Sequence, residues 1–296
     1  MKKILIPIDF SETATNAVRY AVDLAESLLE PAELVLLHVC PEVKTAETVA
    51  ASEEAQYKRQ EAEEEALSKL QAFARAHCRH SGIHNCLTMV TTGKLTKAIV
   101  NAVEMSQAEL IIMGTRGGFG SGTFLASTNT SQLTGVAPCP VLAVPDVTIY
   151  RPILKIVFAA DLSLATIPDL QQTVKLAQTL NCQLQVVHVS ENKNEPGKQE
   201  KINQFWEEVQ WQIRFPWIDF ITVEANDITE GLEQFVLAQE ADMLVVCPKK
   251  RSLFNLMLNG STTRQILIDA LLPTLVLPHH EEEREEAEES EEVLFA

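Results

Sequence analysis

An internal duplication constrains the fold of this chain more than any other feature of its sequence. Four segments of the first half recur in the second half in the same order: 3–11 as 155–163, 34–39 as 184–189, 110–113 as 243–246, and 140–145 as 273–278. The last two pairs share one offset of 133 residues, which chance matches seldom do. A length of 296 residues also fits two domains at about 150 residues each. The sequence therefore predicts tandem domains at 1–146 and 152–279, followed by a tail at 280–296.

Within each copy, short apolar runs alternate with longer amphipathic segments. Runs of strand length lie at 3–8, 33–40, 86–91, 109–114 and 140–145, and in the second copy near 154–160, 183–189, 217–223, 242–247 and 274–278. Helices are expected in the first copy at 12–29, 50–80, 94–106 and 128–136, with Ser11 as the first N-cap. Strands that are apolar throughout are buried on both faces, which indicates a parallel sheet covered by helices. The predicted class is α/β, with five parallel strands in each domain.

The acidic charge balance argues against nucleic acid and anionic membranes as partners. The net charge is −17, of which nine Glu and one Arg in 281–296 supply −8. The remainder is still negative and repels phosphate-rich surfaces. The tail has too few large apolar residues to fold by itself, so we expect a solubilising segment there. The alternative is a helical extension that docks on the core through Val293-Leu294-Phe295.

The cysteines and the apolar runs bear on location. Six cysteines are scattered without a CxxC pair, which favours reduced thiols. No run approaches the roughly 18 apolar residues of a membrane span, and Asp9 interrupts the first run too early for a signal peptide. The sequence therefore predicts a cytoplasmic protein.

A glycine cluster after the fourth predicted strand is the strongest sign of a ligand. Five of the 11 glycines lie between Gly114 and Gly122, and the hydroxyl-rich segment 127–130 follows at an expected helix start. Glycines let backbone N–H groups approach a ligand, and a helix N-terminus adds unpaired donors and a positive dipole end. The pattern predicts an anion cradle suited to phosphate, with a flexible surface loop as the alternative. Thr123 stands where a Walker loop needs Lys, and no GxGxxG is present.

Several motifs around this loop resemble those of universal stress proteins. They are Ile6-Pro7-Ile8-Asp9-Phe10-Ser11, Leu37-His38-Val39, Met113-Gly114-Thr115-Arg116-Gly117, Ser127-Thr128-Asn129-Thr130 and Ala137-Pro138-Cys139-Pro140-Val141. The family motif is Gly, two residues, Gly, nine residues, then Gly-Ser or Gly-Thr, and this chain keeps that spacing up to Ser127. The resemblance covers 2–146 strongly and 153–279 more weakly. It implies two doubly wound sheets of strand order 3-2-1-4-5, in which the first and fourth strands are neighbours.

The resemblance also implies an adenine-nucleotide site in the first copy, holding ATP with or without Mg²⁺. Asp9 and the backbone at Pro7, Ile8 and Val39 would face adenine and ribose, Met113, Gly114 and Gly117 would line the ribose and phosphate path, and Ser127, Thr128, Asn129 and Thr130 would meet the phosphates. One departure is Ser127, which stands where the motif has glycine, so its Cβ could crowd the phosphates. The implied role is a stress-response sensor or regulator.

The second copy departs further from the motif. Cys247 and Lys250 replace the first two glycines, and Pro248 removes an N–H donor, although Gly260-Ser261 is kept. We therefore expect the second copy to have lost ATP binding and to act as a structural partner. In the resembled family the last strands of two domains often pair, so Val141–Val144 and Leu275–Leu277 could form an internal pseudo-dimer, and a homodimer remains open.

Other side-chain groups were weighed as sites. His77, Cys78, His80, His84 and Cys86 include the usual zinc ligand types, but their spacing fits none of the standard pairs and favours a helix end instead. His38 and His188 are equivalent in the two copies, which suggests a structural role near the crevice floor. No catalytic constellation stands out, so enzymatic turnover is limited to slow ATP hydrolysis. The alternative function is a non-nucleotide interaction module that recognises a protein or a small apolar ligand.

Overall fold

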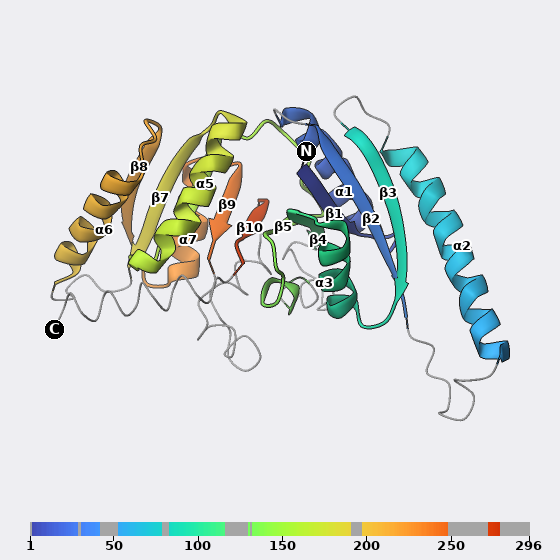
Figure 1. Ribbon diagram of the computed structural model, residues 1–296. Helices are drawn as coiled ribbons and strands as arrows, with labels where there is room; N and C mark the ends of the chain where they lie inside the picture. Colours follow the sequence, from blue (N-terminus) through green and yellow to red (C-terminus); the bar gives the residue numbers. More distant parts are fainter. Residues whose placement is uncertain are drawn as a thin grey trace. The chain divides into compact units, whose positions relative to one another are not determined.

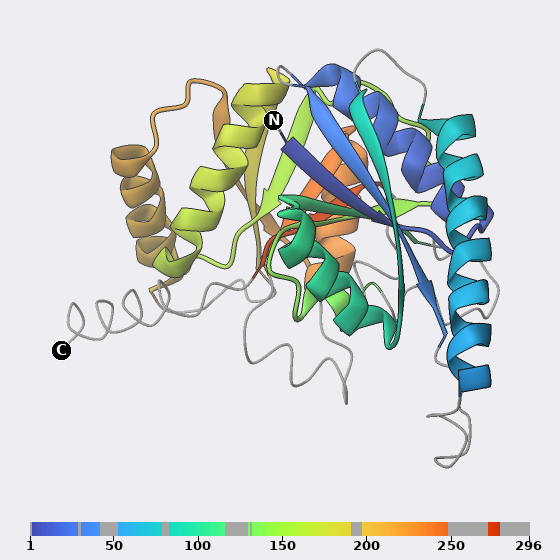
Figure 2. The same cartoon turned by 45° about the vertical axis from the view of Figure 1, so that its right-hand side comes forward.

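The computed structural model describes residues 2–28, 31–41, 53–78, 83–115, 130, 132–190, 197–247 and 272–278. The chain divides into two compact units, with the boundary between Tyr150 and Arg151. We call the described residues up to Tyr150 unit 1 and those from Arg151 onward unit 2. Each unit has its own parallel sheet and flanking helices (Figures 1 and 2). The tail at 280–296 lies outside the described residues.

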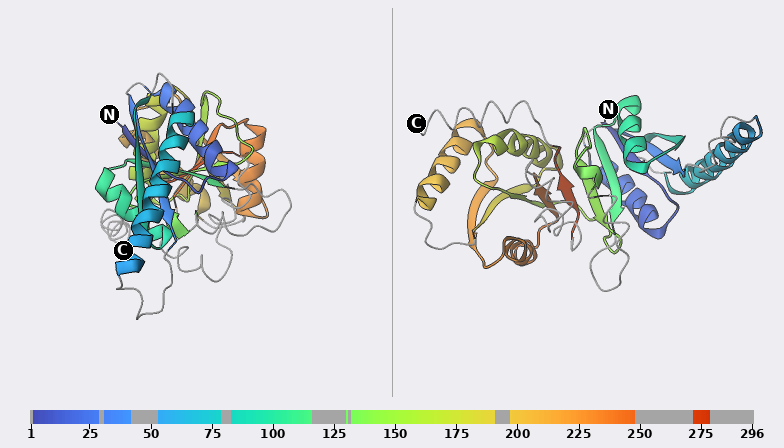
Figure 3. Two further views of the ribbon diagram at one scale, coloured as in Figure 1. Left: turned by 90° about the vertical axis from the view of Figure 1, so that its right-hand side faces the viewer. Right: turned by 90° about the horizontal axis from the view of Figure 1, so that it is seen from below.

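Unit 1 is a doubly wound sheet. Its elements are β1 (Lys2–Pro7), α1 (Glu12–Ser27), β2 (Ala32–Cys40), α2 (Glu53–His77), β3 (Ile83–Thr92), α3 (Leu95–Ser106), β4 (Leu110–Thr115) and β5 (Val141–Pro145). The strands are parallel and follow the order β3-β2-β1-β4-β5. Helices α1 and α3 cover opposite faces of this sheet (Figure 3). The strand order therefore reverses between β1 and β4, where a doubly wound sheet opens a crevice at its carboxyl edge.

Alternation along the strands divides the core of unit 1 between the two faces of the sheet. The cluster on the α3 face contains Leu5, Val35, Leu37, Ile99, Ala102, Val103, Ala108, Ile111, Leu133, Ala137, Cys139 and Val141, with Val39, Met89, Leu95 and Met113 packed against it. On the other face, the buried α1 begins at Ser11, whose hydroxyl accepts a hydrogen bond from the Ala14 N–H at 3.1 Å. The predicted Ser11 cap is thus confirmed.

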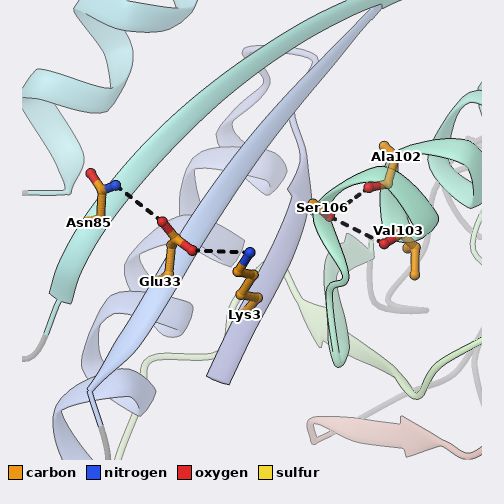
Figure 4. A network of polar contacts seen from close by, with 6 residues as sticks. All are labelled: Lys3, Glu33, Asn85, Ala102, Val103 and Ser106. Carbon is orange, nitrogen blue, oxygen red and sulfur yellow. Dashed lines mark hydrogen bonds and ion pairs between the residues drawn. The ribbon is translucent and has the colours of Figure 1, made fainter. Parts of the chain in front are cut away.

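A polar network joins three strands near their amino ends, at the edge opposite the crevice (Figure 4). The Glu33 carboxylate is buried; it lies 3.6 Å from the Lys3 ammonium and accepts a hydrogen bond from Asn85 Nδ2 at 3.1 Å. Nearby, the Ser106 hydroxyl donates to the Ala102 carbonyl at 2.6 Å and so caps the last turn of α3. Because each partner comes from a different strand, the network also fixes the register of β1, β2 and β3.

Unit 2 repeats this architecture. Its elements are β6 (Lys155–Ala159), the short 3-10 helix η1 (Leu164–Thr166), α5 (Ile167–Leu180), β7 (Gln183–Ser190), α6 (Lys198–Gln212), β8 (Ile218–Glu224), α7 (Ile228–Ala238), β9 (Met243–Val246) and β10 (Thr274–Val276). The parallel order is β8-β7-β6-β9-β10, the same as in unit 1. The predicted α/β class is confirmed. No helix in the described part of the chain is long and apolar enough to cross a membrane.

Element boundaries differ from the sequence expectation mainly at β3. The strand begins at Ile83 instead of 86, because polar residues such as Asn85 extend the pairing with β2 although they do not continue an apolar run. Helix α2 is shorter than the predicted 50–80, and of the predicted helix 128–136 the described residues Thr130 and 132–134 are helical. Apolar patterning therefore locates the elements better than it sets their ends.

Candidate functional site

The candidate site lies where the carboxyl ends of β1 and β4 meet in unit 1. These strands are hydrogen-bonded parallel neighbours, with Ile4 opposite Leu110 and Leu5 opposite Ile111. The two strands run in the same direction, so their carboxyl ends lie side by side. The predicted site residues at the end of β1 (Pro7, Ile8 and Asp9) and of β4 (Met113 and Gly114) therefore come together there. Val39, near the end of β2, joins Met113 in the core cluster below that edge.

The turn after β1 is held by two local contacts. Asp9 is exposed, and its Oδ1 accepts a hydrogen bond from the Ser11 N–H at 3.0 Å. Phe10, between them, has a left-handed φ of 64°, which is unusual for a bulky residue. His38 on β2 contacts the Ile8 carbonyl through Nδ1 at 2.7 Å, and because a carbonyl only accepts, the ring donates through that nitrogen. One oxygen of the exposed Asp9 carboxylate is therefore committed to the turn.

The corresponding turn of unit 2 has the same construction. Asp161 Oδ1 accepts from the Ser163 N–H at 2.9 Å, Leu162 has a φ of 65°, and His188 Nδ1 lies 3.0 Å from the Ala160 carbonyl. Unit 2 keeps this geometry although its loop after β9 lacks the first two glycines. The Asp, the left-handed residue and the His therefore support the fold in both units, as the sequence equivalence of His38 and His188 suggested.

The two units differ at the end of the fourth strand. A Cβ added to Gly114 would lie 2.5 Å from the Thr13 carbonyl oxygen in the first turn of α1. The φ of Gly114 is not left-handed, so the glycine is required here by the close approach of a helix to a strand. In unit 2 the equivalent residue is Cys247, and the turn that corresponds to the start of α1 is the 3-10 helix Leu164–Thr166. Unit 1 thus combines a glycine at the end of its fourth strand with an α-helical start of α1, whereas unit 2 combines a cysteine with a 3-10 helix.

Thr115, the last residue of β4, carries an unsatisfied polar group. It is 0% exposed, and its Oγ1 has no hydrogen-bond partner. Alternation places Thr115 on the same face as Met113, next to the loop that contains the remaining glycines. A buried hydroxyl without a partner costs about 1–3 kcal/mol, so any polar group that reached this atom would stabilise unit 1. Thr115 was not among the predicted site residues, because a threonine at the end of an apolar run looks like an ordinary strand former.

Phe10 forms one side of an aromatic group next to the β1 turn. Its ring centroid lies 4.8 Å from that of His38 and 5.9 Å from that of Phe73 on α2, and the Lys69 ammonium lies 4.1 Å from the Phe10 centroid. Phe73 in turn contacts His77, whose pKa is lowered by burial and by the charge of Arg19. The group attaches α2 to the turn that carries Asp9. Sequence reasoning did not single out Phe10, because contacts with a helix about 60 residues away leave no local pattern.

The remaining predicted site residues can be placed only in part. Thr130 is buried in a helical segment. Gly117, Ser127, Thr128 and Asn129 lie outside the described residues, as do Pro248, Lys250 and Gly260-Ser261 of the second copy.

Of the His and Cys group at the end of α2, His80 and the side chain of His84 lie outside the described residues. No cluster of three or more His, Cys, Asp or Glu side chains suited to a metal ion occurs among the described residues.

Comparison with known proteins identifies a family for the first half of the chain. The family model described as "Universal stress protein family" matches residues 1–145. A universal stress protein of Thermus aquaticus is 30% identical over 143 residues, which are 48% of this chain and 98% of that protein. A second, of Synechocystis, is 29% identical over 144 residues, or 49% of this chain and 85% of that protein.

A solved structure extends the likeness to both units. The crystal structure of a universal stress protein from Archaeoglobus fulgidus has a TM-score of 0.67 and covers 94% of this chain and 97% of its own, at 17% identity. At that identity the likeness concerns the fold alone.

Proposed function

The chain belongs to the universal stress protein family, and from this premise we propose that unit 1 binds an adenine nucleotide, ATP in the first place, as a cytoplasmic sensor or regulator in a stress response. The crevice at β1 and β4 would receive the ligand. The base and ribose would lie against Asp9 and the backbone at Pro7, Ile8 and Val39. The phosphates, with or without Mg²⁺, would extend toward Gly117 and the segment 127–130.

The observation that carries the proposal is the unpaired hydroxyl of Thr115. This side chain is fully buried at the carboxyl end of β4, beside Gly114 and directly before the glycine-rich loop. A hydroxyl at this position can donate to a ligand oxygen or accept from a ligand hydroxyl. A hydroxyl or phosphate oxygen of a nucleotide would supply the hydrogen-bond partner that this side chain lacks. We assign no reaction to the site, and any turnover would be limited to slow hydrolysis.

Unit 2 would not bind a second nucleotide. The turn after β6 keeps the construction of the turn after β1. At the end of the fourth strand, however, Cys247 replaces the glycine and Pro248 follows it. We propose that unit 2 acts as a structural partner and that the two domains form an internal pseudo-dimer, with a homodimer as a further level of assembly. One nucleotide per chain is the expected stoichiometry.

Isothermal titration calorimetry with MgATP tests this proposal. The unmodified protein should bind one nucleotide, and Thr115→Val, which removes the hydroxyl at nearly constant volume, should weaken binding about fivefold to tenfold, the equivalent of one hydrogen bond. Without nucleotide, Thr115→Val should melt at the same temperature or higher, because an unpaired buried hydroxyl is removed. Thr222→Val, the same change on an exposed position of β8, is the matched control and should alter neither quantity.

Two results would contradict the proposal in different ways. If millimolar MgATP gives no heat of binding with the unmodified protein, unit 1 is not a nucleotide site and the alternative of an interaction module for a protein or small apolar ligand is favoured. If ATP binds but Thr115→Val binds it equally well, the nucleotide does not use the hydroxyl that supports the proposed position.

A further inference from the structure

The segment through which the chain leaves unit 1 is held beside the candidate site. We call residues 145–150 the strap. It begins where β5 ends next to β4, and there the Asp146 N–H donates to the Thr115 carbonyl at 2.8 Å. Its last residue, Tyr150, meets the ring of Tyr20 on α1 edge to face, with the ring centroids 5.1 Å apart. The strap therefore contacts both β4 and α1, the two elements that border the site.

One side chain of α1 clamps the strap. Asn16 Nδ2 donates to the Pro145 carbonyl at 3.1 Å and to the Thr148 carbonyl at 2.9 Å. The two N–H groups of a single side-chain amide thus have one acceptor each. Both acceptors lie more than 100 positions away in the sequence, so the contact is a tertiary one that joins α1 to the strap.

Polar contacts, more than apolar packing, hold the strap. The side chains of Val147 and Ile149, on either side of Thr148, are 81% and 85% exposed. Apolar side chains that stay in water contribute little burial energy to the position of the segment. Segments with few buried apolar contacts open at a low cost in free energy. A change at the anchors can therefore release the strap without unfolding unit 1.

The anchors of the strap belong to the residues that form the candidate site. Thr115, whose carbonyl holds Asp146, is also the residue whose buried hydroxyl has no partner. Gly114 lies against Thr13, one turn before Asn16 on α1. A ligand between the end of β4 and the start of α1 would hold these two elements together. The strap already holds the same two elements, so ligand and strap would stabilise one arrangement.

The chain is anchored again directly after the strap. Arg151, the first residue of unit 2, places its Nε 2.8 Å from Asp242 Oδ1. The other oxygen of Asp242 accepts from the N–H groups of Leu154 at 2.8 Å and of Lys155 at 3.0 Å. The strap and this anchored start of unit 2 are consecutive in the chain, so a change in the strap is passed to unit 2 along the backbone.

The second copy does not repeat the clamp at the equivalent position. The offset of 152 residues that relates segment 3–11 to 155–163 brings Pro168 to the position of Asn16. A proline side chain has no hydrogen-bond donor. The donor is therefore present in the unit for which we propose a nucleotide and is replaced in the other unit.

We propose that the strap is a conformational switch that reports ligand occupancy of unit 1 to the start of unit 2, with Asn16 as its positioning residue. This inference rests on the proposed nucleotide site and names its regulation. A bound nucleotide favours the closed strap, and the closed strap favours the nucleotide. Because coupling between two equilibria is reciprocal, a fully released strap weakens nucleotide binding by the same factor by which the nucleotide favours closure.

Hydrogen–deuterium exchange resolved to single amides, with calorimetry on the same samples of the full chain, tests the switch. The amides to follow are those of Asp146 and Thr148, which donate to the carbonyls of Thr115 and Pro145. Saturating MgATP should slow their exchange about fivefold or more, the lower end of the usual coupling between sites. If calorimetry shows that MgATP binds and both amides exchange at the unliganded rate, the switch is wrong while the nucleotide site stands. If MgATP gives no heat of binding, the nucleotide site fails and the switch fails with it.

Asn16→Ala tests the clamp. Alanine favours a helix, so α1 should stay folded, as circular dichroism will show. In the free variant the two strap amides should exchange faster, and MgATP should bind more weakly than to the unmodified protein. Asn203→Ala, the same change at an exposed position of α6, is the matched control and should alter neither quantity. If the variant's strap exchanges as fast as an unfolded segment and MgATP still binds with unmodified affinity, the nucleotide does not depend on the strap and the proposal is overturned.

Discussion

Replacing Gly114 by alanine should destabilise unit 1 through the packing of α1 and independently of any ligand. The added Cβ would lie 2.5 Å from the Thr13 carbonyl oxygen, 2.7 Å from its Cγ2 and 2.9 Å from its carbonyl carbon. Two of these three atoms belong to the backbone of the first turn of α1, which cannot rotate away as a side chain can. The start of α1 must therefore move, or its first turn must change form.

The size of the effect follows from two opposing contributions. Overpacking of this kind costs about 1–3 kcal/mol. An alanine at an ordinary φ restores about 0.4–1 kcal/mol by restricting the unfolded chain. We expect a net loss of about 1–2 kcal/mol in the free energy of unfolding. Thr13→Ala removes the Cγ2 contact but leaves the nearest atom, the carbonyl oxygen, so in the double variant it should restore less than half of this loss.

Urea unfolding measures this prediction with two probes. Far-UV circular dichroism follows both units, whereas all three tryptophans, Trp206, Trp211 and Trp217, belong to unit 2, so their fluorescence reports that unit. Gly114→Ala should lower the midpoint seen by circular dichroism. An unchanged stability within about 0.5 kcal/mol, below the range for overpacking, or full recovery in the Thr13→Ala double variant, would show that the helix does not press on this strand as described.

Three further changes test other parts of the structure. His38→Leu and His188→Leu should each cost about 0.5–1.5 kcal/mol, because each removes one hydrogen bond to a carbonyl; urea unfolding should give similar losses, and a loss in only one would contradict a shared structural role. Ser11→Ala should cost about 1 kcal/mol by removing the N-cap of α1, measured in the same way, and an unchanged midpoint would argue against the cap. Burial raises the pKa of Cys139 from about 9 in the unfolded chain to about 12 in the folded unit, so the free energy of unfolding should fall as pH rises between these values. A Cys139→Ala variant should lose less stability over this range. An equal loss of stability in the variant and the unmodified protein would count against the buried thiol.

Sequence patterns predicted the features of this fold that depend on neighbours along the chain. The apolar runs located all ten strands of the described structure because a strand buried on both faces must be apolar at successive positions. The Ser11 cap was visible for a similar reason, since a cap contacts a residue only three positions away. Such features depend only on residues that are close together in the sequence, so one sequence is sufficient to predict them.

Features that depend on distant contacts could not be predicted in the same way. The sequence suggested that glycines near position 114 serve the approach of a ligand, and it did not reveal that Gly114 also makes room for Thr13, about 100 positions earlier. The unpaired state of the Thr115 hydroxyl depends on all the elements that enclose it. In each case the residue type was visible in the sequence, and the partner, or its absence, was not.

The duplication allows structural and ligand-related features of the crevice to be separated within one molecule. The turn after the first strand keeps its Asp, its left-handed residue and its His contact in both units, so these features alone cannot distinguish a unit that binds a nucleotide from one that does not. The end of the fourth strand differs, with Gly114 and Thr115 in unit 1 and Cys247 and Pro248 in unit 2. A difference in ligand binding between the units is therefore expected at the end of the fourth strand and the loop that follows it, or at the helix start that packs against it, where unit 2 has the 3-10 helix Leu164–Thr166. For this reason Thr115 is a sharper probe of the proposed site than Asp9, whose removal would also disturb a turn that both units need.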